Sequence, residues 1–304
     1  MPELPEVQTV VSDLNEKIKG DVIVDFWSEW AKAIKGKTLK NFQKEVVGRK
    51  VVGVRRIGKN IFIDLSGGKT LYIHLKMTGH LLVKPAHLTP LSRRVRRDIS
   101  PEYRGEGNDF FDDRVNQYIR HKWILKDKNG KIKKLEFSDV RKFAKIVLDD
   151  TDKINELKEI KALGIDALDP KFNFQKFQEI LERKPKSQVG VILMDQNLIA
   201  GIGNIYRSEI IFAAGILPER RIEKITLIEQ KKLYASIGKI LKKAIELRGT
   251  SDSDYRDTAG APGENQKVLK VYRKEKQKCQ KCGTMIVRST LGQRSVFFCP
   301  KCQC

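Results

Sequence analysis

The chain has 304 residues, of which 40% are hydrophobic and 32% are charged. This apolar content is sufficient for packed cores and argues against global disorder, and the length suggests two domains with a small third module. The 60 basic residues outnumber the 38 acidic ones, which gives a net charge of +22. Such an excess favours a polyanionic partner, because lysine and arginine neutralise phosphates, although a solvated basic surface is the alternative.

The sequence predicts neither a membrane span nor a secretory signal peptide. The longest apolar run, from Ile210 to Leu217, is far too short to cross a bilayer. The first residues, MPELPEVQ, contain no basic region ahead of an apolar stretch. We therefore expect a cytoplasmic protein with no membrane contact.

The first predicted element is a short helix that begins almost at the N-terminus. Apolar residues from Val7 to Ile18 follow helical spacing, Pro5 suits a first helical turn and Gly20 suits a helix end. From Phe42 to about Leu148 the pattern changes to short β-branched runs, at residues 50–56, 61–65, 70–75 and 142–148. Several such strands favour a sandwich or a barrel.

A polar, arginine-rich stretch interrupts the strands between Pro85 and about Asn116. It contains Arg93, Arg94, Arg96 and Arg97. We interpret it as a loop insertion that is mobile or faces phosphates.

Helical periodicity dominates after Asp149, and a loop without a clear pattern covers residues 249–266. Helices are predicted over residues 173–182, 187–199, 205–214 and 227–247. Between the second and third, a glycine turn at Ala200–Gly203 precedes Asn204, which is a good N-cap. A helix N-terminus of this kind binds phosphate, but a plain helical hairpin explains the composition equally well.

All five cysteines lie in the last 26 residues. Cys279-x2-Cys282 and Cys299-x2-Cys302 are separated by sixteen residues, a spacing that predicts one tetrahedral zinc site closed by four thiolates. Four free thiols or two disulfides are the alternatives. A closed shell of thiolates makes the metal structural rather than catalytic. Residues 267–281 carry seven basic side chains against one acid, so the intervening hairpin suits a nucleic-acid groove, with protein contact as the alternative.

Taken together, these blocks resemble the formamidopyrimidine-DNA glycosylase family, which is also called the Fpg/endonuclease VIII family. The matching segments are MPELPEV at residues 1–7, Gly58-Lys59, HLKMTG at 74–79, LMDQ at 193–196, GIGNIY at 201–206 and QRSVFFC at 293–299. The resemblance implies an α+β chain with an N-terminal β-sandwich led by a helix, a helix–two-turns–helix domain and a C-terminal zinc ribbon. We expect the domains at residues 1–148, 149–266, with a flexible loop at 249–266, and 267–304.

The resemblance also implies a base-excision repair enzyme that removes oxidised purines from damaged double-stranded DNA, nicks the strand and acts as a monomer on the nucleoid. Removal of Met1 exposes the secondary amine of Pro2, which attacks C1′ of the deoxyribose. Glu3 protonates O4′, and Glu6 helps to hold the lesion in the pocket. Lys59 contacts a phosphate near the lesion and donates a proton during elimination.

The remaining residues implied by the family contact DNA. Asn204 and Arg294 bind the phosphates that flank the extruded nucleotide. Arg294 is counted with the catalytic residues, and Tyr206 is counted with the DNA-binding residues. Met77 fills the gap in the duplex, Arg141 contacts the orphaned base and Phe143 is the aromatic wedge. The wedge loop is VRKFA at residues 140–144, where the family usually has PRRFG, and Gly190 stands where a lysine is common.

Two rival functions are compatible with parts of this pattern. An endonuclease VIII-like enzyme prefers oxidised pyrimidines, but the combination of Met77, Arg141 and Phe143 favours the purine branch. A non-catalytic zinc-ribbon protein that binds damaged DNA explains the basic tail, but it has no use for Pro2 and Glu3 at the N-terminus.

Overall fold

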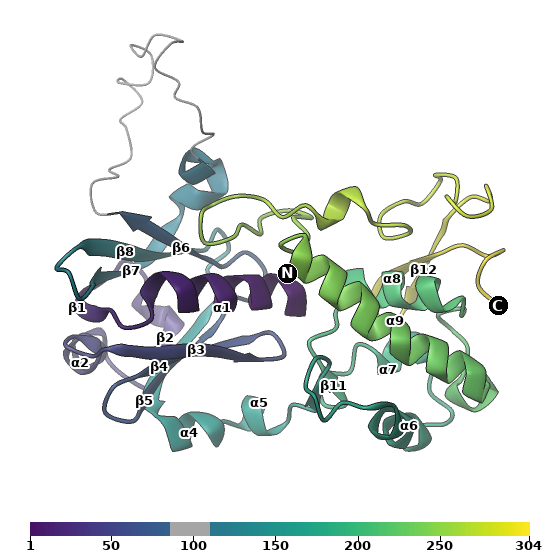
Figure 1. The fold of residues 1–304 in the computed structure, drawn as a ribbon, viewed down its shortest axis with the longest axis horizontal. Helices are drawn as coiled ribbons and strands as arrows, with labels where there is room; N and C mark the ends of the chain where they lie inside the picture. Colours follow the sequence, from purple (N-terminus) through teal and green to yellow (C-terminus); the bar gives the residue numbers. More distant parts are fainter. Residues whose placement is uncertain (86–109) are drawn as a thin grey trace, which may run out of the picture.

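The computed structural model describes residues 1–85 and 110–304, which form a β-rich lobe and a helical lobe side by side (Figure 1). Helix α1 (Leu4–Ile18) runs through the β-rich lobe and brings the N-terminus to the junction between the lobes (Figure 1). Its first turn is closed by a capping box between Glu3 and Glu6, and Pro5 lies at the start of the helix as predicted. Most of α1 is buried, so the start of the chain is fixed by packing on several sides.

The β-rich lobe is a sandwich of two sheets around an apolar core, which confirms the predicted fold class. One sheet has the order β1 (Val22–Ser28), β7 (Ile119–Lys126), β8 (Ile132–Ser138), β6 (His80–Pro85). The other has the order β2 (Ile34–Lys35), β9 (Lys145–Asp150), β5 (Lys69–His74), β4 (Asn60–Leu65), β3 (Val51–Ile57). All neighbours are antiparallel except β2 and β9.

The strand-like pattern expected from Phe42 onward is wrong at its beginning. Helix α2 (Leu39–Val46) occupies that segment, with the Thr38 side chain accepting a hydrogen bond from the Asn41 amide as its cap. Phe42 and Val46, one helical turn apart, are buried against the sandwich. Of the predicted insertion, residues 86–109 with their arginines lie outside the described part, and residues 110–112 and 114–117 form short 3₁₀ turns.

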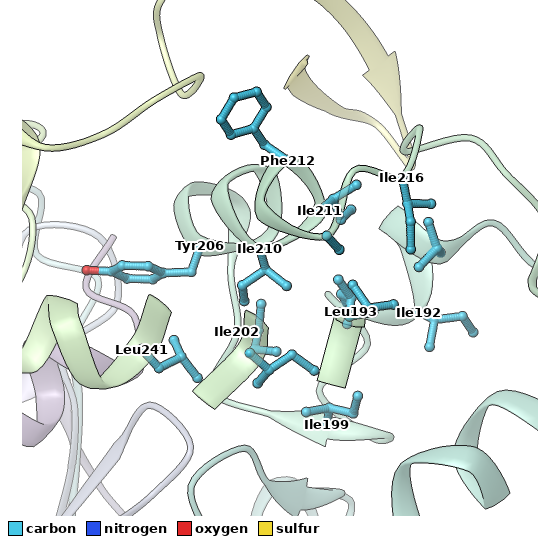
Figure 2. Close-up of a cluster of buried hydrophobic side chains, with 14 of the residues drawn as sticks. Ile192, Leu193, Ile199, Ile202, Tyr206, Ile210, Ile211, Phe212, Ile216 and Leu241 are labelled. Atoms are coloured by element: carbon cyan, nitrogen blue, oxygen red, sulfur yellow. The ribbon is translucent and has the colours of Figure 1, made fainter. Parts of the chain in front are cut away.

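Two short helices, α4 (Thr151–Asn155) and α5 (Lys158–Lys161), lead from the sandwich toward the helical lobe (Figure 1). The helical lobe contains α6 (Phe174–Glu182), α7 (Val189–Ile192), α8 (Asn204–Ala214), α9 (Leu227–Glu246) and the paired short strands β10 (Ile165–Asp166) and β11 (Ile199–Ala200). Aliphatic side chains from α7, α8, α9 and the turn before α8 meet in its core (Figure 2).

The helix predicted over residues 187–199 is mostly wrong, because only α7 is α-helical. The segment after it folds into turns organised by Asp195, whose carboxylate accepts a hydrogen bond from the Asn197 amide at 3.0 Å. Ile199 then pairs with Ile165 as a strand. The long-range pairing with β10 therefore replaces the helix that local periodicity suggested.

The last segment of the chain is the predicted hairpin, β12 (Val287–Leu291) and β13 (Arg294–Phe298), with its tip at Gly292 and Gln293. Buried Cys279 and Cys299 pack into the same apolar core as the helical lobe, so the hairpin module is attached firmly to α8. Across residues 1–85 and 110–304, every helix is too short or too polar to cross a bilayer.

Candidate active site

The N-terminus of α1 meets the N-terminus of α8 at the junction of the lobes. The Glu3 carboxylate accepts hydrogen bonds from the backbone N–H groups of Gly203 at 2.8 Å and Ile205 at 2.9 Å. A side chain at position 203 would overlap the Glu3 carboxyl group, so this approach requires glycine. The N-cap of α8 is consequently Gly203, and the prediction that Asn204 caps the helix is wrong by one residue. The free N–H groups of α8 bind a carboxylate from α1 instead.

A cavity of about 300 Å³ opens at this junction. The side chains that line it come from both lobes and from the hairpin, among them Met1, Glu3, Lys59, Met77, Asn204, Asp252, Ser253 and Arg294. Pro2 is buried behind the exposed Met1, and while Met1 is present the Pro2 nitrogen is an amide. Loss of Met1 converts it to a secondary amine next to Glu3. The structure thus brings five of the sequence-predicted site residues to one cavity: Glu3, Lys59, Met77, Asn204 and Arg294.

Glu6 lies directly behind Glu3 and is fully buried. Its carboxylate accepts hydrogen bonds from the Glu3 amide at 2.7 Å, from the Thr250 amide at 2.7 Å and from the Tyr206 hydroxyl. Burial, reinforced by the charge of Glu3, raises the pKa of Glu6 to about 7. Glu6 therefore supports the cavity from below and carries a proton through part of the neutral range.

Tyr206 does not reach the surface, contrary to its placement among the DNA-binding residues. Its ring extends sideways from α8, away from the aliphatic cluster (Figure 2), and none of the side chain is exposed. The hydroxyl donates to Glu6 and lies 3.0 Å from the Thr250 hydroxyl. Because the side chain is enclosed by these partners, it holds Glu6 in position and has no free surface for a ligand.

Lys59 lies in the tight turn between β3 and β4, as predicted, and this turn inserts into the junction. Its side chain is 8% exposed, and Nζ donates to the carbonyl oxygen of Ile202 at 3.0 Å. Burial lowers the pKa of Lys59, while the nearby charges of Glu3 and Glu6 oppose that shift. A buried lysine with a lowered pKa beside two carboxylates is suited to proton transfer.

Met77, Arg141 and Phe143 come together at the rim of the β-rich lobe. The Arg141 guanidinium lies 4.8 Å from the centre of the Phe143 ring, and its Nη1 is 3.0 Å from the Met77 sulfur. Met77 is 40% exposed and Phe143 is 53% exposed, so neither belongs to the core. These exposed fractions exclude a role in core packing, which is the usual role of methionine and phenylalanine.

A buried aspartate that sequence reasoning missed holds this group together. The Asp139 carboxylate accepts hydrogen bonds from the backbone amides of Arg141, Phe143 and Ala144 and from the Thr78 hydroxyl. Thr78 follows Met77, so one side chain fixes both the 140–144 loop and the Met77 turn. In the sequence, the only indication of this role is that Asp139 directly precedes the loop. An aspartate before a loop is common, so the sequence alone did not identify it.

The segment after α9, predicted as a flexible loop, also reaches the cavity through Asp252 and Ser253. Ion pairs tie it to the β-rich lobe: Arg248 lies 2.6 Å from Asp13, and Arg256 lies 2.7 Å from Asp113. Asp252 pairs in turn with Arg273 at 2.8 Å. The first two ion pairs join residues more than 130 positions apart, and the third involves a segment without periodicity. The sequence therefore could not indicate these contacts.

A second, polar cavity of about 680 Å³ adjoins the first along the hairpin. It is lined by Asn204, Tyr272, Arg273, Glu275, Arg288, Gln293, Arg294, Ser295 and Phe297. Arg294 is exposed and borders both cavities, as does Asn204. Exposed arginines beside an amide at a helix N-terminus form a suitable binding surface for phosphate oxygens.

The four paired cysteines form a metal site of the predicted kind. Their sulfur atoms all lie within 4.8 Å of one another, with Cys282 and Cys299 at 3.4 Å and Cys279 and Cys302 at 3.9 Å. Four sulfurs about 2.3 Å from a tetrahedral zinc ion are separated by roughly 3.8 Å, so the donor set fits one structural zinc. Cys304 is exposed and is not part of this set.

The order of these parts is that of a class of DNA-processing enzymes. The family model described as Formamidopyrimidine-DNA glycosylase N-terminal domain matches residues 1–146, the Formamidopyrimidine-DNA glycosylase H2TH domain matches residues 163–255, and the Zinc finger found in FPG and IleRS matches residues 276–303. A curated formamidopyrimidine-DNA glycosylase of Pelotomaculum thermopropionicum is 34% identical over 303 residues, which cover 100% of this chain and 99% of the relative. The chain belongs to the formamidopyrimidine-DNA glycosylase family.

Solved structures agree with this assignment. The Lactococcus lactis Fpg bound to DNA with an abasic site superposes with a TM-score of 0.81 at 27% identity, and 99% of each chain is covered. A Lactococcus lactis Fpg mutant bound to Fapy-dG-containing DNA gives a TM-score of 0.82 with the same identity and coverage.

Proposed function

We propose that the chain is a bifunctional DNA glycosylase and abasic-site lyase of base excision repair. Its substrates are oxidised purines such as 8-oxoguanine and formamidopyrimidines in double-stranded DNA, and it nicks the strand by β,δ-elimination. The observation that carries the proposal is the junction itself, where Glu3, the residue after Pro2, binds the N-terminus of α8 and lines one cavity with the buried Lys59.

The chemistry begins once Met1 is removed. An α-amino group has a pKa of roughly 7.7–8.0, so a useful fraction of Pro2 is neutral near pH 7. The neutral nitrogen attacks C1′, the glycosidic bond breaks, and the base leaves with a proton while Glu3 protonates O4′ to open the sugar. The resulting iminium acidifies C2′, and loss of the C2′ proton expels the 3′ phosphate. Loss of the C4′ proton from the conjugated iminium then expels the 5′ phosphate. Lys59 is placed to assist these proton transfers.

The rest of the molecule supports the extruded nucleotide. Asn204 and Arg294 bind the flanking phosphates, Met77 and Phe143 fill the duplex, and Arg141 contacts the base left behind. We assign residues 1–148, 149–266 and 267–304 to the catalytic, helical and zinc domains. We expect the enzyme to act as a monomer on the nucleoid in the cytoplasm.

Covalent trapping tests the proposal directly. The protein is incubated with a duplex carrying 8-oxoguanine opposite cytosine in the presence of borohydride, which reduces the iminium to a stable amine. We expect a protein–DNA adduct with the wild type and none with Pro2→Gly. Equal trapping of both proteins would exclude Pro2 as the nucleophile.

A second duplex distinguishes the rival functions. If a duplex carrying an oxidised pyrimidine is trapped much faster than the 8-oxoguanine duplex, the endonuclease VIII-like function is the better description. Binding without any adduct, in a protein whose Met1 is shown by mass spectrometry to be absent, would support the non-catalytic alternative.

A further inference from the structure

Arg207, in the first turn of α8, is an almost completely buried arginine at the meeting point of three segments. Its exposed fraction is 1%. Nη1 donates to the carbonyl oxygen of Gly190 on α7 at 3.2 Å. Nη2 donates to Asn204 Oδ1 at 2.5 Å and to the carbonyl oxygen of Ser295 on the hairpin at 3.0 Å. One guanidinium therefore joins α7, the start of α8 and the zinc-bound hairpin.

The Arg207 guanidinium has no carboxylate in direct contact among the described residues. Throughout residues 1–85 and 110–304, no carboxylate lies within ion-pair distance of its guanidinium, and Nε has no hydrogen-bond partner. Burial lowers the pKa of Arg207 to about 10, which still leaves the group protonated at neutral pH. A buried cation satisfied only by neutral oxygens is costly unless an anion lies nearby. The charge of Glu3, at the start of α8, opposes this pKa shift, and the adjacent polar cavity, lined by Asn204 and Arg294, has room for a further anion.

The contact with Asn204 determines how that side chain meets the cavity. An asparagine amide has one oxygen that only accepts and one nitrogen that only donates. Because Oδ1 accepts from Arg207, the amide nitrogen is directed away, toward Tyr272 on the cavity wall. The amide thus presents donors, which is the polarity that a phosphate oxygen needs.

The contact with the hairpin sets the position of Arg294. Ser295 follows Arg294, and its carbonyl is bound by the same Nη2 that binds Asn204. The hairpin also lies close to α7: a Cβ atom at Gly190 would come within 2.6 Å of Leu291 Cδ2. The absence of a side chain at Gly190 therefore allows the hairpin to approach the guanidinium.

We propose that Arg207 is a positioning residue that unites Asn204 and Arg294 into a single phosphate-binding unit, acting through the Asn204 amide and the hairpin rather than by touching DNA. This inference rests on the proposed function, because it requires that the cavity bind a DNA phosphate.

A double-mutant cycle on DNA binding tests it. The probe is a duplex containing tetrahydrofuran, an abasic-site analogue that the enzyme cannot cleave. Arg207→Met and Asn204→Ala are each expected to weaken binding about ten-fold, and the double variant should bind no more than about three-fold more weakly than Arg207→Met alone. A double variant that binds about a hundred-fold more weakly than the wild type would show two independent effects and would overturn the proposal. An Arg207→Met variant with unchanged affinity would also overturn it. If the wild type fails to prefer this duplex over undamaged DNA, the proposed function fails instead.

Three further variants separate positioning from folding and from net charge. Arg183→Met removes the same charge from an exposed site directly after α6 and should change the affinity less than two-fold. Asn204→Asp keeps an acceptor for Arg207, so the melting temperature of this variant should not fall. Because the new carboxylate repels phosphate, however, the variant should bind the duplex more weakly than Asn204→Ala does. Arg207→Lys keeps the charge but cannot reach all the acceptors. If it holds one zinc ion and binds as tightly as the wild type, the proposal is wrong, whatever the stability of Arg207→Met.

Discussion

The two regions that would act on the extruded nucleotide differ in how they are built. At the lobe junction, Glu3 and Glu6 are 3% and 1% exposed and receive hydrogen bonds from backbone amides on α1, on α8 and after α9. At the rim, Met77 is 40% exposed and Phe143 is 53% exposed, and both contact the Arg141 side chain.

The difference follows from what each region has to do. Carboxylates in a low-dielectric junction are held in one geometry and can have shifted pKa values, which suits proton transfer. Exposed apolar tips keep their surface available for bases, and only their attachment is rigid, through buried Asp139. We therefore expect variants at the junction to affect chemistry and variants at the rim to affect recognition.

Glu3→Gln should give the largest effect. Loss of the proton donor should slow release of 8-oxoguanine by about 10²–10⁴-fold, the usual range for general acid catalysis. Single-turnover assays on the lesion and on a preformed abasic site measure the two steps separately. Elimination at the abasic site should suffer less, because no base has to leave. Equal losses on both substrates would instead make Glu3 a structural cap of α8.

Arg141→Ala should change selectivity rather than chemistry. A bidentate contact with a base contributes roughly 1–3 kcal/mol, so the preference for cytosine over adenine opposite the lesion should fall by about ten- to a hundred-fold. Excision of 8-oxoguanine opposite each of the four bases provides the measurement, with Lys142→Ala in the same loop as the control. An unchanged ratio for Arg141→Ala would show that another residue contacts the orphaned base.

Met77→Ala should slow excision about ten-fold against every opposite base, because an unfilled gap lets the extruded nucleotide return to the stack. The ratio between opposite bases should stay constant, which distinguishes this variant from Arg141→Ala. Met285→Ala is the matched control, because Met285 is also exposed, at 52% against 40% for Met77, and lies on the zinc module. A selective effect of Met77→Ala on one opposite base would contradict the division of roles at the rim.

The smallest effect concerns stability at the junction. Because the pKa of Glu6 is raised from 4.5 to about 7, the folded protein holds a proton there that the unfolded chain has lost. Glu6 therefore makes the free energy of unfolding fall as the pH rises from about 4.5 to 7. The slope of this fall corresponds to the release of at most about one proton on unfolding. Urea denaturation across this range should show a shallower fall for Glu6→Gln. Parallel curves for the two proteins would mean that Glu6 is not protonated in the folded state.

Short-range features of this protein were predictable from the sequence alone. The start and end of α1 follow from Pro5, Gly20 and the spacing of apolar residues, and the strands β3 to β5 follow from β-branched runs bounded by turns. The zinc site follows from cysteine spacing, because each pair places two thiolates on one tight turn. Each of these depends on spacings within one short segment of the chain.

Other features depend on partners that are distant in the sequence. The segment after α7 is not helical because Ile199 pairs with β10, and Gly203 rather than Asn204 caps α8 because Glu3, 200 residues earlier, binds its free amides. The family motif alone marks Pro2 and Glu3, since a proline and an acid at a helix start are otherwise unremarkable. The meeting of the N-termini of α1 and α8 gives Glu3 its cavity. The pKa of Glu6 is raised and that of Lys59 is lowered because only tertiary burial removes the water that would otherwise surround them.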